Sequence, residues 1–229
     1  MKYIKKGSPP PELAKWFNKQ PIEKGRRINC TYNDMDRAVK DAVKARLLQD
    51  QGLLCCYTGI HIEAHTSHIE HFKPQSQCEG HEDIDYNNLL AAYPLAGCDF
   101  GARARGNKPV PINPMSAACE GKFQFNLSGK ISPADKDDRN AIATIKNLRL
   151  DHPSLIEMRQ HAIDEVLYRH NERLSDAQLV QVARHYCDRM ANRQFRHFCF
   201  VIASAAKELQ RKQKQYREHQ KANRRKKRK

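Results

Sequence analysis

The sequence predicts a mostly helical α+β fold, in which a small β-containing unit lies among helices and a basic tail ends the chain. Apolar residues recur at helical spacing over 34–51 and again through most of the second half. Between these regions, short apolar runs bounded by turn-forming residues are typical of strands. The predicted parts are an N-terminal arm and helix (1–52), a β-containing core (53–115), a helical C-terminal region (116–206) and a basic tail (207–229).

The N-terminal part contains one well-defined helix. A stiff proline run at 8–11 precedes it, and the apolar stripe itself covers 34–51. Asn33 or Asp34 can cap the helix at its start, and Gly52 follows at the position where helices commonly end.

The β-containing core begins with a predicted hairpin. The Thr58-Gly59 pair indicates a turn within 53–62, and 89–93 reads as a further strand. The segment 94–114 is rich in glycine and proline, so we expect irregular structure there.

The second half is expected to consist of helices. A capping box, Ser175-x-x-Gln178, opens one of them, and Pro153 stands at a favourable first-turn position of another. The predicted helices cover 140–150, 153–170, 175–190 and 193–220.

Charge is concentrated at the C-terminal end. The chain carries a formal net charge of +15, and 207–229 alone holds twelve basic and two acidic residues, a net of +10. Such a tail repels itself, so we expect its end to be disordered when free and to bind a polyanion, with nucleic acid the first candidate. A solubilising tail or a localisation address is the alternative. The residues assigned to this contact are Arg224, Arg225, Lys226 and Lys227.

The cysteines and the apolar segments indicate the compartment. None of the eight cysteines forms a Cys-x-x-Cys pair, and the chain shows neither a signal peptide nor an apolar run of membrane-spanning length. We therefore expect free thiols, a cytoplasmic protein and no contact with a membrane.

Five of the eleven histidines lie within 61–81, at His61, His65, His68, His71 and His81. On a helix, the first three would share one face, as in a metal-binding helix. On a strand, His68 and Glu70 would share a face, with His71 at the strand end, able to turn toward the same site. The β-branched residues and the closing proline of this stretch favour the strand.

Several motifs in this region occur in a fixed order: an acidic residue before a histidine, a polar loop, an asparagine, and a Gly-rich, basic turn. They include Glu70-His71-Phe72-x-Pro74 and Asn88-Leu89-Leu90. This order resembles HNH endonucleases, whose ββα-metal unit is similar, and the resemblance is closer to the PtuB-type nucleases of Septu and retron-associated anti-phage systems. Further matching blocks are Met1-Lys2-Tyr3-Ile4, Leu54-Cys55-Cys56-Tyr57, Asp85-Tyr86-Asn87, Gly106-Asn107-Lys108-Pro109-x-Pro111-Ile112-Asn113-Pro114 and Ile142-x-Thr144-Ile145-x-x-Leu148.

The resemblance implies that 53–115 is an HNH ββα-metal unit, and phosphodiester chemistry gives its residues roles. A neutral imidazole suits the deprotonation of water at neutral pH, so His71 is the expected general base. Glu70 is the expected ligand of one Mg²⁺ or Mn²⁺ ion, which would neutralise charge on the phosphate. Asn88 would hold the loop that orients His71 or, less favoured, approach the metal.

The remaining site residues are less sharply defined. In the family, a His, Asn or Asp of the following helix completes the metal site; Asp99 and Asn107 are the candidates, and we favour Asn107. His68 is either a ligand or a supporting residue. Arg103, Arg105 and Lys108 are assigned to phosphate contacts, with a solvated loop as the alternative.

One departure from the family concerns zinc. The family often carries Cys-x-x-Cys where this chain has Cys55 and Thr58, and another cysteine near the position of Tyr93. We therefore expect no structural zinc ion.

The predicted function is that of a metal-dependent HNH endonuclease acting in anti-phage defence. The resemblance implies a PtuA-type partner, an ATPase of the ABC/SMC-like class, and in the retron-associated branch a reverse transcriptase with its RNA–DNA hybrid. The sequence leaves DNA and RNA open as substrates. The alternative function is that of a nucleic-acid-binding adaptor with a degenerate HNH site, whose basic tail is the functional part.

Overall fold

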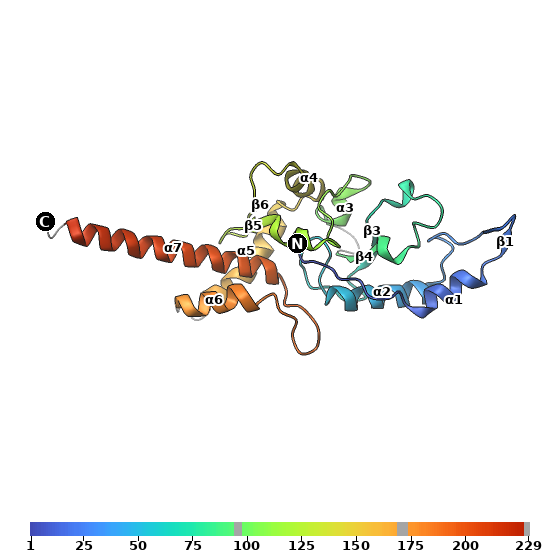
Figure 1. Cartoon of the computed structure of the whole chain (residues 1–229), viewed down its shortest axis with the longest axis horizontal. Helices are drawn as coiled ribbons and strands as arrows, with labels where there is room; N and C mark the ends of the chain where they lie inside the picture. Colours follow the sequence, from blue (N-terminus) through green and yellow to red (C-terminus); the bar gives the residue numbers. More distant parts are fainter. Residues whose placement is uncertain (94–97, 169–173, 227–229) are drawn as a thin grey trace.

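The computed structural model describes residues 1–93, 98–168 and 174–226 of the chain. The molecule is elongated: the β1–β2 hairpin lies at one end and helix α7 projects from the other (Figure 1). The predicted α+β class is confirmed, because the described residues form helices and small two-stranded antiparallel sheets. In that part of the chain, no helix has both the length and the apolar character needed to cross a membrane.

The N-terminal part consists of two helices with a short hairpin between them. The elements are α1 (Pro11–Lys19), β1 (Ile22–Glu23), β2 (Arg26–Arg27) and α2 (Arg37–Gln51). Gly52 ends α2 in the left-handed conformation, with φ 58°, as predicted. The start of α2 differs from the prediction: its N-cap is Asp36, not Asn33 or Asp34, because the residues before it form turns.

The central unit has the order strand, strand, short helix. Leu54 and His61, on either side of the predicted Thr58-Gly59 turn, form an isolated antiparallel bridge. The elements that follow are β3 (His68–His71), η1 (Gln75–Gln77), η2 (Tyr86–Asn88), β4 (Leu89–Ala92) and α3 (Ala102–Arg105). Strands β3 and β4 pair antiparallel, with His71 opposite Leu89. The strand prediction for the histidine-rich stretch is thus confirmed, whereas α3 interrupts a segment expected to be irregular.

Strand β4 is the buried centre of this unit. All four of its residues are buried, and the side chain of Gln51, at the end of α2, reaches its backbone. The Gln51 amide accepts from the Ala91 N–H at 2.7 Å and donates to the Ala91 carbonyl at 2.8 Å and the Leu54 carbonyl at 2.7 Å. A buried amide with its hydrogen bonds satisfied fixes the strand against the helix.

The described residues of the C-terminal half form a 3-10 helix, η3 (Ala117–Gly121), a hairpin and four α-helices. The elements are β5 (Phe123–Phe125), β6 (Ile131–Pro133), α4 (Arg139–Leu148), α5 (Pro153–Leu167), α6 (Asp176–His185) and α7 (Cys199–Lys226). The capping box at Ser175 is confirmed, although α6 ends before the predicted residue 190. The β5–β6 hairpin was not predicted, since its strands are only three residues long.

Helix α7 was predicted over 193–220, with disorder expected only at the end of the tail; the helix is observed from Cys199 to Lys226, so it starts later and extends further than predicted. It continues without a break from the core to Lys226, so most of 207–229 is helical; the last three residues lie outside the described part. Its start is anchored on the central unit, where Phe198 N–H donates to the Gly59 carbonyl and His61 N–H donates to His197 Nδ1, both at 2.9 Å. The basic helix is therefore directly attached to the β-containing core.

Candidate functional site

The imidazole of His71, the last residue of β3, is fixed by two contacts. Its Nε2 lies 2.8 Å from the backbone carbonyl of Asp83, and because a carbonyl only accepts, Nε2 carries the hydrogen. The ring also meets the Tyr32 ring edge-on, with centroids 4.6 Å apart. Nδ1 has no hydrogen-bond partner among the described residues and is not among the buried polar atoms. In the neutral ring this nitrogen keeps the lone pair, so it can accept a proton from water.

Asn88 fastens both ends of the loop between β3 and β4. Its Oδ1 accepts from the Lys73 N–H at 2.7 Å, and its Nδ2 donates to the carbonyls of Lys73 at 3.2 Å and Glu82 at 3.0 Å. Glu82 precedes Asp83, whose carbonyl holds His71. The asparagine therefore positions the histidine through the loop, which is the role favoured for it from the sequence.

We expect Asn88→Asp to lower the free energy of unfolding by about 1–3 kcal/mol, because the shape is kept while the hydrogen bonds donated by Nδ2 are lost. The new carboxylate would also face the two carbonyl oxygens of Lys73 and Glu82. Chemical denaturation of the wild type and the variant measures the loss. Asn87→Asp is the matched control, since that side chain is exposed; equal stability of both variants would contradict the bracing role.

Glu70 lies on the other face of β3, against a buried arginine. Its Oε1 accepts a charge-assisted hydrogen bond from Arg105 Nη1 at 2.6 Å, and the Tyr57 hydroxyl donates to the same oxygen at 3.4 Å. Burial raises the pKa of Tyr57 well above its usual value, so this hydroxyl stays protonated. One oxygen of the carboxylate is thus fixed by the protein, and the other points toward His68.

His68 and Glu70 share a face, as the strand alternation predicts. Their Nε2 and Oε2 atoms are 3.7 Å apart, and His68 Nδ1 is buried without a hydrogen-bond partner. A carboxylate oxygen and an imidazole nitrogen this close together are a donor pair that a divalent ion can use, and Mg²⁺ keeps several water ligands and needs few from the protein. Within the described ranges, no three His, Cys, Asp or Glu side chains cluster as ligands. The residues therefore fit an ion held by two protein ligands, with the remaining positions left to water and substrate.

His71 does not turn toward this face, and here the structure differs from the prediction. The contacts of its ring are Tyr32 and the Asp83 carbonyl, and no contact in the described part of the chain joins it to His68 or Glu70. The reason is the pleat of β3, which sends neighbouring side chains to opposite faces.

The candidates for a third metal ligand are not brought to Glu70. Asp99 and Asn107 flank α3 and are both exposed. In the described part of the chain, neither contacts Glu70 or His68, and the place beside the Glu70 carboxylate is filled by Arg105.

Arg105 is the largest correction to the predicted site. Only 1% of the residue is exposed, so it is not available to a phosphate group in this conformation. Besides Glu70, its guanidinium donates to the Tyr57 hydroxyl at 2.9 Å, to the carbonyls of His71 at 3.0 Å and Lys108 at 2.8 Å, and to the carbonyl of Phe72. It therefore ties the end of α3 to the end of β3.

The other predicted cations lie at the surface. Arg103 and Lys108 are exposed on and after α3, and Arg224 is exposed on α7. Arg225 and Lys226 belong to the last turn of α7, and Lys227 lies outside the described residues.

Cys55, at the position where the family often carries Cys-x-x-Cys, and Cys98, the cysteine that follows Tyr93 in the sequence, each form a hydrogen bond with the protein. The Cys55 thiol accepts from the Tyr93 N–H at 3.3 Å, and the Cys98 thiol donates to the Phe100 carbonyl at 3.6 Å. Burial opposes ionisation of Cys55, but hydrogen bonds from Cys56, Thr58 and the Tyr93 N–H together lower its pKa to about 6.

Sequence reasoning missed the roles of Tyr57, Asp83 and Tyr32. Asp83 acts through a backbone carbonyl, which any residue carries, so its type gives no signal. Tyr57 was named only as part of a matching block and given no role in the site, and its hydroxyl reaches Glu70. The signal that points to it is the phenol hydroxyl itself, because a tyrosine packed into a core needs a hydrogen-bond partner for that group.

Comparison of the whole chain with protein-family models gives no match, and comparison with curated proteins gives none either.

Proposed function

We propose that the chain is a metal-dependent endonuclease that hydrolyses phosphodiester bonds of nucleic acid. The observation that carries this proposal is the His71 ring, whose Nε2–H is fixed by the Asp83 carbonyl while Nδ1 keeps a lone pair with no partner among the residues that the structure describes. An imidazole fixed in this way suits a general base that takes a proton from an attacking water. The order of two strands and a short helix, together with the Asn88 brace, also supports it.

Each residue then has a defined task. His71 accepts the proton of the water at Nδ1, and Asn88 holds the loop that orients His71. Glu70, through Oε2, and His68 would hold one Mg²⁺ or Mn²⁺ ion, which supplies charge neutralisation at the phosphate. Arg105 and Tyr57 fix the remaining oxygen of Glu70.

The resemblance to PtuB-type nucleases extends the proposal to an anti-phage role. In that setting the chain acts with an ABC/SMC-like ATPase, and where a retron is present, with a reverse transcriptase and its RNA–DNA hybrid. This part of the proposal is supported by the ordered sequence motifs alone.

The second candidate function is a nucleic-acid-binding adaptor that does not cleave. The observation that favours it is Arg105, whose positive charge lies on the carboxylate expected to bind the metal. The exposed cations of α7 would then be the functional part.

A cleavage assay on the full chain tests the two functions. The substrates are single-stranded and duplex DNA, single-stranded and duplex RNA, and transfer RNA. We expect cleavage when Mg²⁺ or Mn²⁺ is present and no cleavage when a chelator is added. Re-addition of the ion to the chelated enzyme is the control for chelator damage. The nuclease proposal would be overturned in favour of the adaptor by two results together. The full chain would bind nucleic acid without cutting it in the presence of any of the ions, and removal of 207–229 would abolish this binding.

A further inference from the structure

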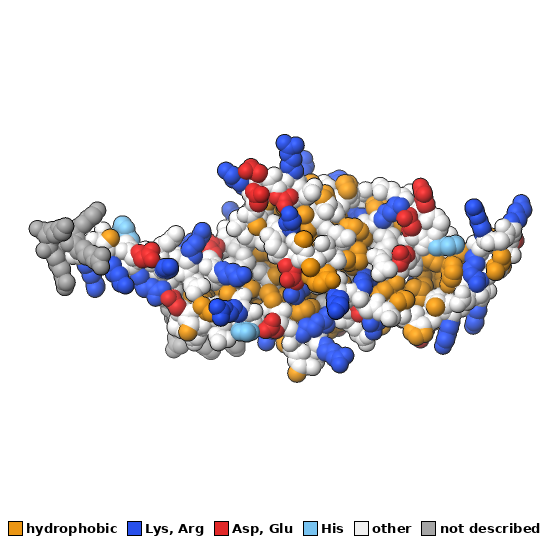
Figure 2. All heavy atoms as spheres, viewed as in Figure 1, with side chains coloured by type: hydrophobic (Ala, Val, Ile, Leu, Met, Phe, Trp, Pro, Cys, Tyr) orange, Lys and Arg blue, Asp and Glu red, His pale blue; other side chains and the backbone are white. Residues whose placement is uncertain are grey.

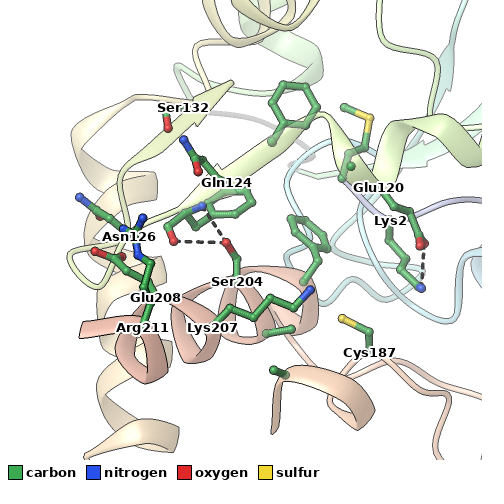
Figure 3. A pocket seen from close by; sticks show the side chains of 17 residues that line it. Lys2, Glu120, Gln124, Asn126, Ser132, Cys187, Ser204, Lys207, Glu208 and Arg211 are labelled. Atoms are coloured by element: carbon green, nitrogen blue, oxygen red, sulfur yellow. Dashed lines mark hydrogen bonds and ion pairs between the residues drawn. The ribbon is translucent and has the colours of Figure 1, made fainter. Parts of the chain in front are cut away.

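A groove of about 780 Å³ lies away from His71, between the β5–β6 hairpin and the first turns of α7 (Figure 3). Ser204 of α7 fixes the hairpin to the helix: its hydroxyl accepts from the Phe125 N–H at 2.9 Å and donates to the Phe125 carbonyl at 3.3 Å. Phe123 and Phe125 are buried beneath. The groove is therefore a fixed feature of the fold, with both walls joined by hydrogen bonds.

The polar side chains of this groove leave a positive charge unbalanced. Both of its carboxylates have partners: Glu120 pairs with Lys2 at 2.8 Å, and Glu208 pairs with Lys212 at 2.8 Å. Glu120 also accepts from the Tyr3 N–H, and Glu208 from the Leu127 N–H, both at 3.0 Å.

Two cations of the groove remain without a counter-ion. In the described part of the chain, Lys207 and Arg211 form no ion pair, and both are exposed. Gln124 and Asn126, opposite them on the hairpin, add neutral amide groups (Figure 3).

The same face of α7 continues the positive charge beyond the groove. At 3.6 residues per turn, Lys207, Arg211, Lys214 and Lys221 lie on one side of the helix, with one acidic residue, Glu218, among them. All four cations are exposed, and Lys and Arg side chains are visible along this helix in Figure 2. We call the groove and these four residues the basic groove-and-helix surface.

A different face of α7 packs on α6. Leu209 and Gln213 are buried there, and Arg217 forms an ion pair with Asp176. The cations of the basic groove-and-helix surface therefore point away from α6 and are not used to hold the helix in place.

We propose that the basic groove-and-helix surface binds the phosphate backbone of a nucleic-acid strand, at a site separate from His71. Lys and Arg with neighbouring amide side chains are the groups that proteins use for phosphate contacts. The rise from Lys207 to Arg211 is about 6 Å, and the whole row extends over about 21 Å, long enough for several nucleotides.

An acidic protein partner fits this surface less well. Protein interfaces centre on exposed aromatic or apolar anchors, and the exposed aromatic residue of α7, Tyr216, lies on the side of the helix opposite the cations. The inference deepens the proposed function, because a strand bound here would lie on a helix that is attached to the β-containing core. It rests on the proposed function in one respect, the identification of the bound strand as the substrate.

The test is a binding titration of the full chain in a chelator, so that no cleavage intervenes. Fluorescence anisotropy with a labelled 20-nucleotide strand and the matching duplex is measured at several salt concentrations. The triple variant Lys207→Gln, Arg211→Gln, Lys214→Gln is expected to bind at least 10-fold more weakly. The slope of log Kd against log salt should fall by about 2, because each lost phosphate contact removes about 0.7–0.9.

The matched control removes the same charge at the other end of the molecule. It is Lys15→Gln, Lys19→Gln, Arg26→Gln, all exposed residues, and it should change Kd less than threefold. An equal loss of affinity in both triple variants, or no loss in the first, would overturn the inference. If the first triple variant lost its binding to polyglutamate but bound nucleic acid as tightly as the wild type, the inference would be overturned in favour of an acidic protein partner.

Failure of the proposed function is separable from failure here. If the wild type binds but never cuts in any metal ion, and the first triple variant still loses affinity and salt dependence, the binding surface stands while the nuclease proposal falls.

Discussion

Replacing His71 with alanine is expected to lower the rate of phosphodiester cleavage by about 10²–10⁴-fold, the usual contribution of a positioned general base. The ring is the group whose free Nδ1 can take the proton of water, and no neighbouring side chain contacts it on that nitrogen within the described residues. Single-turnover cleavage of a labelled substrate, with the enzyme in excess of the substrate and above its Kd and with the metal ion saturating, measures the rate of the chemical step.

The control for this result is His161→Ala, a replacement of an exposed histidine on α5. It should cleave at the wild-type rate. His71→Ala should also keep the affinity for nucleic acid measured in a chelator, because phosphate contacts are assigned to cations elsewhere. Unchanged cleavage by the alanine variant would remove His71 from the mechanism, and an equal drop in both variants would point to general loss of folded protein, which a thermal melt detects.

The part of this site that the sequence could predict is the part that depends on local chain geometry. The β-branched residues of the stretch favour a strand, and the pleat then places His68 and Glu70 on one face. Asn88 was also assigned correctly to the loop, because an amide can both accept from and donate to backbone groups at a strand end.

The incorrect parts depend on tertiary closure. Arg105 stands in a Gly-rich, basic segment, where an arginine is normally solvated, and nothing local indicates that α3 carries it under β3. The β5–β6 hairpin is too short for a periodic pattern, although it forms one wall of the groove. The end of the tail was expected to be disordered because of its charge, yet the helix predicted to residue 220 continues to Lys226, since its first turns are anchored in the core.

Replacing Arg105 with methionine is expected to give the largest loss of stability of any single change at the site, about 3–5 kcal/mol. Methionine has a similar length but no charge, so the Glu70 carboxylate, whose side chain is 15% exposed, would lose its ion-pair partner. The carbonyls of His71 and Lys108 would lose a donor as well. For a chain of this size, that corresponds to a fall in Tm on the order of 10 °C.

Arg103→Met is the matched control, because Arg103 lies on the same short helix and is exposed. It should change Tm by no more than about 2 °C, in line with surface substitutions. Arg105→Lys should fall between the two, since one ammonium group keeps the charge but cannot reach carbonyls on both sides of the site as a guanidinium does.

A double variant distinguishes the buried charge from the lost packing. If the cost of Arg105→Met comes mainly from the unpaired carboxylate, adding Glu70→Gln should recover part of the lost Tm, because a neutral amide needs no counter-ion. Full additivity of the two changes would show that Arg105 acts through its backbone contacts alone. A near-wild-type Tm for Arg105→Met would contradict the structural role assigned to the guanidinium. It would leave Arg105 free for the phosphate contact predicted from the sequence, which then requires a conformation in which α3 releases it from Glu70.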